Sequence, residues 1–313
     1  MRHALRLLVR VVALACAGVA GYFVWKNPES GAIDARARAG ASGQFVPLSH
    51  GITHYETAGP DTARTVVLVH GFSVPYYIWD STFAAVRGAG YRVIRYDVYG
   101  RGLSDRPDAA YDGALYDAQL DELLDSLHVT RPVDLMGVSF GGFVTAHYVR
   151  THPARVHTLT LVDPVAKRFD LPEALRIRGV GYYMWQTMHV PAMAENQASD
   201  FLHPERFPGW ADRYRPQMKF DGFGRALLRT AITLSTMDVD SLYGGVARTG
   251  VPTLLVWGRQ DQTVPFALSD TVRRSMPGAE FLAVDSSGHL PILEQSAPVH
   301  AAILAFLAGH PPA

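Results

Sequence analysis

Short apolar runs alternate with helix-length segments over most of this 313-residue chain, and this alternation limits its possible folds more than any other feature. Several runs show little in–out alternation, which is typical of strands that helices cover on both faces. Strands that alternate with helices predict a mainly parallel, doubly wound α/β sheet. The predicted strands are Thr65–His70, Tyr91–Tyr96, Val133–Val138, Thr158–Val162, Thr253–Trp257 and Glu280–Val284.

Helices are expected between these strands, and an antiparallel hairpin is expected before them, over Gln44–Thr57. The length of the chain fits one large domain, or one domain that carries an insertion. The predicted helices are Tyr77–Gly88, Tyr111–Leu127, Phe140–His152, Pro265–Ser275 and Pro291–Leu307.

The interval between Val162 and Thr253 has no clear core strand and is rich in aromatic residues and methionine. We expect helices that lie over the sheet there, and we interpret most of these side chains as the core of the insertion itself. For the segment Tyr182–Met188 a second interpretation is equally open, in which some side chains form an apolar substrate pocket. The candidate substrate contacts in this segment are Tyr183, Trp185 and Met188.

A G-x-S-x-G motif over Gly137–Gly141 has Ser139 at its centre. It comes directly after a predicted buried strand and directly before a predicted helix. A sharp turn at this position puts the serine at its apex, with the N-terminus of the helix facing the reaction site. The motif is common by chance, and its place between strand and helix makes Ser139 a candidate nucleophile.

A serine hydroxyl needs a base to accept its proton, and the sequence offers 13 histidines. His289 lies in the loop between the last predicted strand and the last predicted helix. Since loops at the carboxyl ends of the strands converge on one site, His289 and Ser139 can meet. His189 and His203, both in the insertion, are candidates for an approach to substrate rather than for the base.

The base in turn needs a carboxylate that holds its tautomer and stabilises the imidazolium. Asp261 follows the strand Thr253–Trp257, and the resulting chain order of serine, aspartate and histidine is the one described for this architecture. Asp163, at the end of the preceding strand, is an alternative. Asp285 is a second alternative because it is close to the histidine in sequence.

The oxyanion of a tetrahedral intermediate requires two fixed N–H donors. One candidate is the backbone N–H of Phe140, the residue after the candidate nucleophile. The other lies in the loop after Thr65–His70, where the backbone N–H of Phe72 is the best placed and Gly71 allows a close approach to substrate. We therefore include His70 and Gly71 among the candidate substrate contacts.

The first ten residues contain three arginines, Arg2, Arg6 and Arg10, and an unbroken apolar run follows over residues 11–25. That run alone is shorter than the hydrocarbon core of a bilayer, which is about 30 Å thick. Counted from Leu5 it has about 20 residues, enough to cross if the enclosed arginines extend toward the headgroups. The sequence therefore predicts that residues 1–43 form an uncleaved membrane anchor followed by a tether.

Tyr22, Phe23 and Trp25 cluster at the far end of the apolar run, as in an interfacial belt. The excess of arginine before the run over lysine after it predicts an N-terminus inside and a catalytic part outside the cytoplasm. A cleaved signal peptide, which would release a secreted or periplasmic protein, and a buried helix are alternatives. A lipoprotein signal would use Cys16, but Ala13 stands where leucine is expected.

Charge and cysteine content exclude several other classes of function. Lys+Arg and Asp+Glu both number 29, so a strongly basic surface for nucleic acid is not indicated. Cys16 is the only cysteine, so the chain has no intrachain disulfide, no cysteine-based metal site and no cysteine nucleophile in its globular part. Neither a metal-binding cluster nor a dinucleotide-binding loop is recognisable, and no cofactor is expected.

Together these features resemble the α/β-hydrolase superfamily, in the branch of capped esterases, monoacylglycerol-lipase-like enzymes and carbon–carbon bond hydrolases. The resemblance covers about Gln44–Leu307. It rests on His70-Gly71-Phe72, Tyr96–Asp105, the turn around Ser139, Gly258–Asp261 with Val264-Pro265, and Gly288-His289.

The resemblance implies an α/β-hydrolase core at 44–166 and 243–313, with a helical cap at 167–242 inserted after the sixth strand. It also implies that the stretch Asp97–Ser104 is largely architectural. The serine at the turn argues against the dehalogenase and epoxide hydrolase mechanisms, because those enzymes carry an aspartate there.

The implied function is that of a serine hydrolase acting through an acyl-enzyme intermediate. Its expected substrates are small-molecule or lipid carboxylic esters with a hydrophobic acyl or alcohol part, a monoacylglycerol among them. Carbon–carbon bond cleavage and cofactor-free perhydrolysis by the same three residues are alternatives. A ligand receptor with little turnover is a further alternative from a different class of protein.

Overall fold

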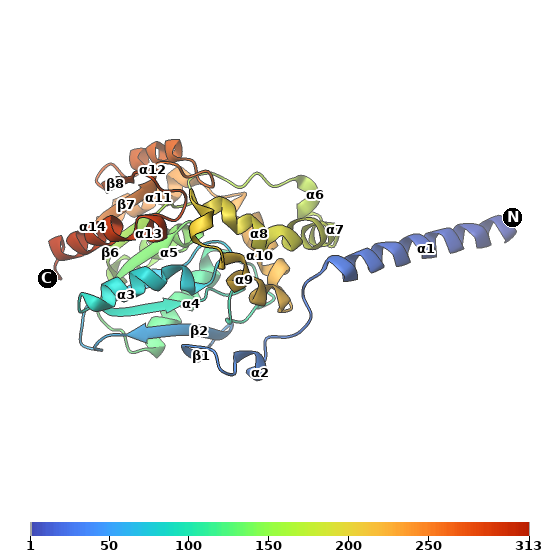
Figure 1. Cartoon of the computed structure of the whole chain (residues 1–313), viewed down its shortest axis with the longest axis horizontal. Helices are drawn as coiled ribbons and strands as arrows, with labels where there is room; N and C mark the ends of the chain where they lie inside the picture. The colour runs from blue at the N-terminus through green and yellow to red at the C-terminus, as the bar shows by residue number, and fades with distance from the viewer. Residues whose placement is uncertain (1, 313) are drawn as a thin grey trace.

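The computed structural model describes residues 2–312, so Met1 and Ala313 of the predicted segments lie outside it. Its centre is one eight-stranded sheet with the strand order β1-β2-β4-β3-β5-β6-β7-β8 (Figure 1). β2 pairs antiparallel with β1 and β4, and the other neighbours pair in parallel. The predicted fold class is thereby confirmed. The strands are β1 (Gln44–Leu48), β2 (Gly51–Ala58), β3 (Thr65–Val69), β4 (Arg92–Tyr96), β5 (Val133–Val138), β6 (Val156–Val162), β7 (Thr253–Gly258) and β8 (Glu280–Val284).

The central strands are buried along their whole length, as their continuous apolar runs predict. Every residue of β3, β4 and β5 is buried, whereas the edge strand β8 is only partly covered. β3 ends at Val69, so His70 is the first residue of the following loop rather than the last of the strand.

Helices cover the sheet on both faces and form two apolar clusters with it. α3 (Asp80–Gly88) and α14 (Ser296–Gly309) pack on one face, and α4 (Gly113–Ser126), α5 (Phe140–Thr151) and α11 (Val239–Thr249) pack on the other. The other core helices are α12 (Ser269–Ser275) and α13 (Pro291–Glu294).

Three predicted helices begin or break differently from the prediction. A 3₁₀ turn over Phe266–Leu268 precedes α12, so the predicted helix over Pro265–Ser275 is α-helical only from Ser269. A 3₁₀ turn over Tyr76–Trp79 precedes α3, so the predicted helix over Tyr77–Gly88 is only partly α-helical. The predicted helix over Pro291–Leu307 is divided at Gln295 into α13 and α14. Pro298 explains this break, because its ring would clash with the carbonyl of residue 294 in a continuous helix.

The cap between β6 and α11 is helical but irregular. Its α-helices have only four or five residues, except α10 with 12 residues, and 3₁₀ or π turns join them. The predicted boundary after Leu242 falls inside α11, which packs on α5 of the core. The cap helices are α6 (Glu173–Arg176), α7 (Val180–Met184), α8 (Met193–Asn196), α9 (Trp210–Tyr214) and α10 (Phe223–Leu234).

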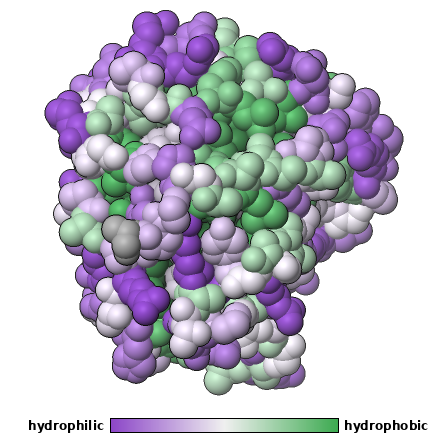
Figure 2. Space-filling model, turned by 90° about the vertical axis from the view of Figure 1, so that its left-hand side faces the viewer, coloured by the Kyte–Doolittle hydropathy of each residue, from purple (hydrophilic) through white to green (hydrophobic). Residues whose placement is uncertain are grey.

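The N-terminal helix α1 (Arg2–Lys26) projects from the side of the molecule that carries α6 and α7 (Figure 1). None of its residues is buried. Among residues 2–312 it is the one helix that is long and apolar enough to cross a membrane, and a signal sequence has the same properties. At the opposite end of the molecule, hydrophilic side chains surround a hydrophobic area (Figure 2).

Candidate active site

Ser139 occupies the turn between β5 and α5 with φ 55° and ψ −118°. A positive φ is uncommon for a residue other than glycine and indicates local strain. Neighbouring strands hold the turn in place. The N–H of Ser139 donates to the carbonyl of Val162 at 2.9 Å, and its own carbonyl accepts from the N–H groups of Gly142 and Val165 at 2.9 and 3.2 Å.

Both glycines of the motif are required by close packing of the backbone. A Cβ on Gly137 would lie 2.3 Å from the carbonyl oxygen of Gly141. A Cβ on Gly141 would lie 2.2 Å from the carbonyl oxygen of Val69 in the neighbouring strand. Since these contacts are with backbone atoms of α5 and of β3, no side chain fits at either position.

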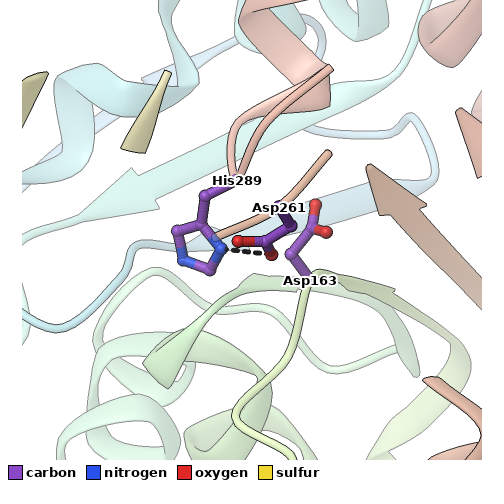
Figure 3. A group of neighbouring side chains, drawn as sticks. All are labelled: Asp163, Asp261 and His289. Carbon is purple, nitrogen blue, oxygen red and sulfur yellow. Dashed lines mark hydrogen bonds and ion pairs between the residues drawn. The ribbon is translucent and has the colours of Figure 1, made fainter. Parts of the chain in front are cut away.

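His289 and Asp261 form a buried hydrogen-bonded pair (Figure 3). The distance between Nδ1 of His289 and Oδ2 of Asp261 is 2.8 Å. The other carboxylate oxygen, Oδ1, accepts from the backbone N–H groups of Thr263 and Val264 at 2.8 and 2.9 Å. With Nδ1 donating to Asp261, Nε2 is the ring nitrogen that can accept a proton.

The environment of His289 favours its protonated form. Burial alone lowers the pKa of His289, but the charge and hydrogen bond of Asp261, together with the charge of Asp200, outweigh it. The pKa of His289 is therefore raised above its ordinary value of 6.5. An imidazolium that forms here is stabilised, as general base catalysis requires.

The two alternative aspartates make other contacts. Oδ1 of Asp163 accepts from the N–H of Gly258 at 2.9 Å. Burial and the neighbouring charge of Asp261 raise the pKa of Asp163 well above its ordinary value, which favours the neutral carboxylic acid. Asp285 lies at the surface in an ion pair with Arg259 at 2.7 Å. Only Asp261 of the three is hydrogen-bonded to His289 in the described chain.

Asp163, Asp261 and His289 come close enough together to raise the question of a metal ion, since one ligand atom from each lies within 4.8 Å of the others (Figure 3). A metal site needs deprotonated carboxylates with free oxygen atoms. Here both oxygens of Asp261 already accept hydrogen bonds, and the raised pKa of Asp163 favours a proton on it. Of the four carboxylate oxygens only Oδ2 of Asp163 has no hydrogen-bond partner within residues 2–312, and the raised pKa of Asp163 favours a proton there rather than a cation.

Ser139 and His289 line the same pocket, of about 280 Å³, at the carboxyl ends of the strands. The Ser139 hydroxyl makes no hydrogen bond within residues 2–312, and such catalytic contacts often tighten only when substrate binds. A larger cavity of about 680 Å³ lies at the amino ends of the strands, away from both residues. The pocket is lined by Gly71, Phe72, Ser73, Val74, Ile78, Ser139, Val165, Phe169, Met193, Asn196, Gln197, Asp200, Thr263, Val264, His289 and Leu290.

The loop containing Gly71 and Phe72 lies against the Ser139 turn. A Cβ on Gly71 would lie 3.5 Å from Cβ of Ser139. The rings of Phe72 and Phe140 meet edge to face, and the guanidinium of Arg101 lies over both while its Nε donates to the Phe72 carbonyl at 2.7 Å. In the described part of the chain neither the Phe72 nor the Phe140 backbone N–H donates to another protein group, so both are free for a ligand.

Comparison with known proteins agrees with this geometry. Residues 66–302 match the family model described as "Alpha/beta hydrolase family". The chain belongs to the alpha/beta hydrolase family. AB hydrolase superfamily protein YfhM of Bacillus subtilis (strain 168) is 26% identical over 295 residues, covering 86% of this chain and 98% of that protein. Lipase 3 of Moraxella sp. (strain TA144) is 25% identical over 242 residues, covering 74% of each.

A pimeloyl-[acyl-carrier protein] methyl ester esterase of Neisseria meningitidis (serogroup B, strain MC58) is 25% identical over 247 residues, covering 76% of this chain and 90% of that protein. Among solved structures, a thermophilic esterase from Thermogutta terrifontis superposes with a TM-score of 0.74 at 23% identity, covering 86% of this hydrolase and all of that chain. The enol-lactonase from Burkholderia xenovorans LB400 gives 0.73 at 21% identity, covering 85% and 100%. The relatives support a hydrolase activity, and the solved structures support the fold.

Four of the five predicted substrate contacts of this hydrolase do not line the pocket. His70 is buried, Nδ1 contacts the Gly71 carbonyl at 2.9 Å and Nε2 accepts from the N–H of Val98 at 2.9 Å. Burial lowers the pKa of His70 to about 4, so it is a neutral structural residue. Gly71, the fifth, does line the pocket.

No residue of the segment Tyr182–Met188 lines the pocket that holds Ser139, and the first part of the segment lies against α1. The Tyr183 hydroxyl donates to the carbonyl of Val19 in α1. Trp185 is buried and stacks on His189, and Met188 is exposed to solvent. Aromatic content alone does not tell which side of a cap helix faces the substrate.

The cap contributes pocket residues that the sequence did not reveal. Gln197 is buried at the pocket, and its Oε1 has no hydrogen-bond partner within residues 2–312. The Asp200 carboxyl accepts from the Thr263 hydroxyl at 2.7 Å, and its backbone carbonyl accepts from the N–H of His289 at 2.8 Å. Burial raises the pKa of Asp200. Both residues lie in the 3₁₀ turn Gln197–Asp200, which is too short for a periodicity that marks a buried face.

Two further carboxylates hold the loops of the site. Glu294 accepts from the N–H of Gly288 at 2.7 Å and from the N–H of His203 at 2.9 Å, which ties the His289 loop to the cap. Asp97 accepts from the N–H groups of Tyr76 and Leu103, both at 2.9 Å. The contacts of Asp97 are those of a loop brace, in keeping with the architectural part expected of the stretch that begins there.

Proposed function

We propose that this protein is a membrane-anchored serine esterase that hydrolyses carboxylic esters with a hydrophobic acyl or alcohol part. The observation that carries this proposal is that a strained serine, Ser139, lines the same pocket as the buried His289–Asp261 pair. Family membership and relatives named as esterase and lipase support the hydrolase part of the proposal.

In the proposed mechanism, Oγ of Ser139 attacks the ester carbonyl while Nε2 of His289 accepts its proton. The Asp261 carboxylate holds the ring and stabilises the imidazolium. The backbone N–H groups of Phe72 and Phe140 donate to the oxyanion. His289 then gives its proton to the leaving alcohol, which departs and leaves an acyl group on Ser139. Water, activated by the same histidine, hydrolyses the acyl-enzyme and restores the serine.

The lining of the pocket supports a substrate with one apolar part. Val74, Ile78, Phe169 and Leu290 supply apolar side chains around the serine. Polar side chains come from the cap, with Asn196, Gln197 and Asp200, and from the core, with Ser73 and Thr263. Burial of an apolar acyl or alcohol chain against such a lining contributes roughly 25 cal/mol per Å² of apolar area, which favours hydrophobic over purely polar esters.

A fluorophosphonate probe and a series of p-nitrophenyl esters from acetate to palmitate test the proposal. We expect covalent labelling of the detergent-solubilised protein and a rate maximum at one chain length. Ser139→Ala must abolish both, and Ser199→Ala, a change of an exposed cap serine, is the matched control that must keep both. A folded protein that is not labelled, or a strong preference for a meta-cleavage product over every ester, contradicts the proposal.

For α1 we propose an uncleaved anchor with the N-terminus in the cytoplasm and the catalytic part outside. Its length and apolar composition support a membrane segment, and the arginines near its start support this orientation. Fractionation of cells that express a C-terminally tagged chain tests it. Full-length protein in the membrane fraction is expected, and a shortened protein in the soluble fraction would identify α1 as a cleaved signal.

A further inference from the structure

We propose that one face of the cap inserts into the bilayer beside α1, so that the membrane holds the cap as well as the anchor. This membrane-facing patch consists of Ile177, Val180, Tyr183 and Met188. The inference rests on the membrane anchor proposed above and adds a second contact with lipid to it.

Exposed apolar side chains gather at the patch. Outside α1, the large apolar side chains exposed in residues 27–312 are Ile177, Val180, Met188 and Leu202, at 57%, 50%, 63% and 36%. Three of these four lie within one short segment of the cap. Single exposed apolar residues are ordinary, whereas a group of them indicates a surface that something apolar covers.

The end of α1 packs against the same segment. The Phe23 ring stacks on the Tyr183 ring with centroids 5.8 Å apart and lies 6.0 Å from that of Tyr182. The Tyr183 hydroxyl donates to the carbonyl of Val19 at 3.2 Å. The cap is therefore in contact with α1 inside the apolar run of the helix, and not only at its end.

The depth of this contact decides the argument. Val19 precedes Trp25 by six positions, which is about 9 Å along a helix. The helix needs nearly all of its length from Leu5 to Trp25 to span about 30 Å of hydrocarbon. If the hydrocarbon ended on the N-terminal side of Val19, the remaining part of α1 would be too short to cross it. Val19 therefore lies within the hydrocarbon, and so does Tyr183, which contacts it at the tip of the cap.

The segment after α1 is fixed to the cap rather than loose. The Glu29 carboxylate accepts from the backbone N–H groups of Gly222 and Gly224, both at 2.8 Å, at the start of α10. A carboxylate at this position is favourable because it faces the positive end of the helix dipole. The N–H of Ser30 also donates to the Lys219 carbonyl at 2.8 Å. The predicted tether is thus a clamp, which prevents α1 from swinging away from the cap.

A lipid bilayer fits the patch better than a protein partner does, because the patch continues the surface of α1 itself. α6 and α7 lie where α1 leaves the globular part (Figure 1). Phe23, Tyr182 and Tyr183 form one aromatic cluster across the contact between α1 and the cap. The cap also lines the pocket of the proposed active site, through Gln197 and Asp200.

Depth-dependent fluorescence quenching tests the insertion in the full-length chain. Cys16→Ser removes the only cysteine, and Val180→Cys or Met188→Cys then adds one site for a bimane label. Asp270→Cys, on the exposed surface of α12, is the matched control. Each protein is placed in nanodiscs of phosphatidylcholine and phosphatidylglycerol, with or without lipids that carry a doxyl quencher on carbon 5 of the acyl chain.

We expect the quencher to reduce the fluorescence at positions 180 and 188 at least twofold, and to leave position 270 unchanged. A label on native Cys16 in the otherwise unaltered chain reports on the anchor itself. Quenching at Cys16 without quenching at 180 and 188 would overturn the insertion of the cap while keeping the anchor. No quenching at Cys16 would show that the anchor proposal itself has failed.

Glu29→Ala tests whether the clamp holds the cap on the membrane. In the Met188→Cys background we expect this change to reduce the quenching at position 188 at least by half, with circular dichroism unchanged. Glu195→Ala, which removes an exposed glutamate of the cap that takes no part in the clamp, is the matched control and should keep the quenching. Equal quenching in both variants would contradict the clamp.

Discussion

The core and the cap meet at one pocket, yet they differ in the regularity of their secondary structure. In the core, buried parallel strands fix the positions of Ser139, Asp261 and His289 through the loops at their carboxyl ends. In the cap, a single 3₁₀ turn after the four-residue helix α8 supplies both Gln197 and Asp200 to the same pocket. The regular core thus positions the residues proposed for the chemistry, and the irregular cap adds polar residues to the lining of the same pocket.

This difference teaches where substitutions will act. A change in the core residues should alter the rate of the chemical step, whereas a change in the cap residues should alter substrate binding or the pH dependence. The predictions below test this division, beginning with the core, where the expected effects are largest.

Ser139→Ala removes the proposed nucleophile, and we expect kcat/KM for p-nitrophenyl butyrate to fall by about 10⁴-fold or more. Steady-state kinetics of the purified protein checks this. Substantial hydrolysis by Ser139→Ala, with contaminating esterases excluded, would mean that the core does not carry the chemistry as proposed.

The two buried aspartates should differ greatly in their effect. Asp261→Asn loses the carboxylate that holds His289, and we expect kcat to fall by about 10³- to 10⁴-fold. Asp163→Asn should cost less than tenfold, because an amide replaces a carboxyl group whose raised pKa favours its neutral form. The ratio of the two kcat values is the measurement. A larger loss of kcat for Asp163→Asn would mean that Asp163, and not Asp261, is the carboxylate that supports His289.

The contrast between core and cap also explains how much could be predicted from the sequence. β3 and β5 are buried on both faces, so their apolar runs are continuous and predict a central parallel sheet. Once the sheet is predicted, the loops at the carboxyl ends of its strands must converge. The sequence alone therefore predicts that Ser139, Asp261 and His289 lie close together. The motif around Ser139 also contains the glycines that the turn requires.

The cap could not be predicted in this way, because its short helices have no room for a repeating apolar face. Trp185 and Met188 are residue types that often line apolar pockets. In the structure, however, Trp185 is buried within the cap and Met188 is exposed at its surface. Gln197 and Asp200 reach the pocket from a 3₁₀ turn whose direction depends on packing against distant parts of the chain. The break of the last helix at Gln295 had a local signal in Pro298, and the prediction of a continuous helix overlooked it.

The pH dependence should reveal a smaller effect that the cap exerts on the core. Hydrolysis requires neutral His289, so kcat/KM should rise with pH through a pKa above 6.5. Asp200 is one of the charges that raise this pKa. Asp200→Asn should therefore move the acid limb of the profile to lower pH, and Asp270→Asn, on the surface of α12, should not move it. An acid limb that stays in place in Asp200→Asn would show that the cap carboxyl does not influence the base.

The smallest effect on the kinetic constants is expected for a change of Gln197. Its side chain lines the pocket but does not touch the reacting groups in the proposed mechanism. Its buried Oε1 lacks a partner in the described structure, and such an acceptor disfavours an apolar group placed against it. Gln197→Leu should lower KM for long-chain esters by roughly threefold while kcat stays the same, since only binding common to the ground and transition states changes. Gln262→Leu, at an exposed position beside Asp261 in sequence, is the matched control and should change neither constant. A loss of kcat in Gln197→Leu would place this cap residue in the chemical step, and the division between core and cap would then no longer hold.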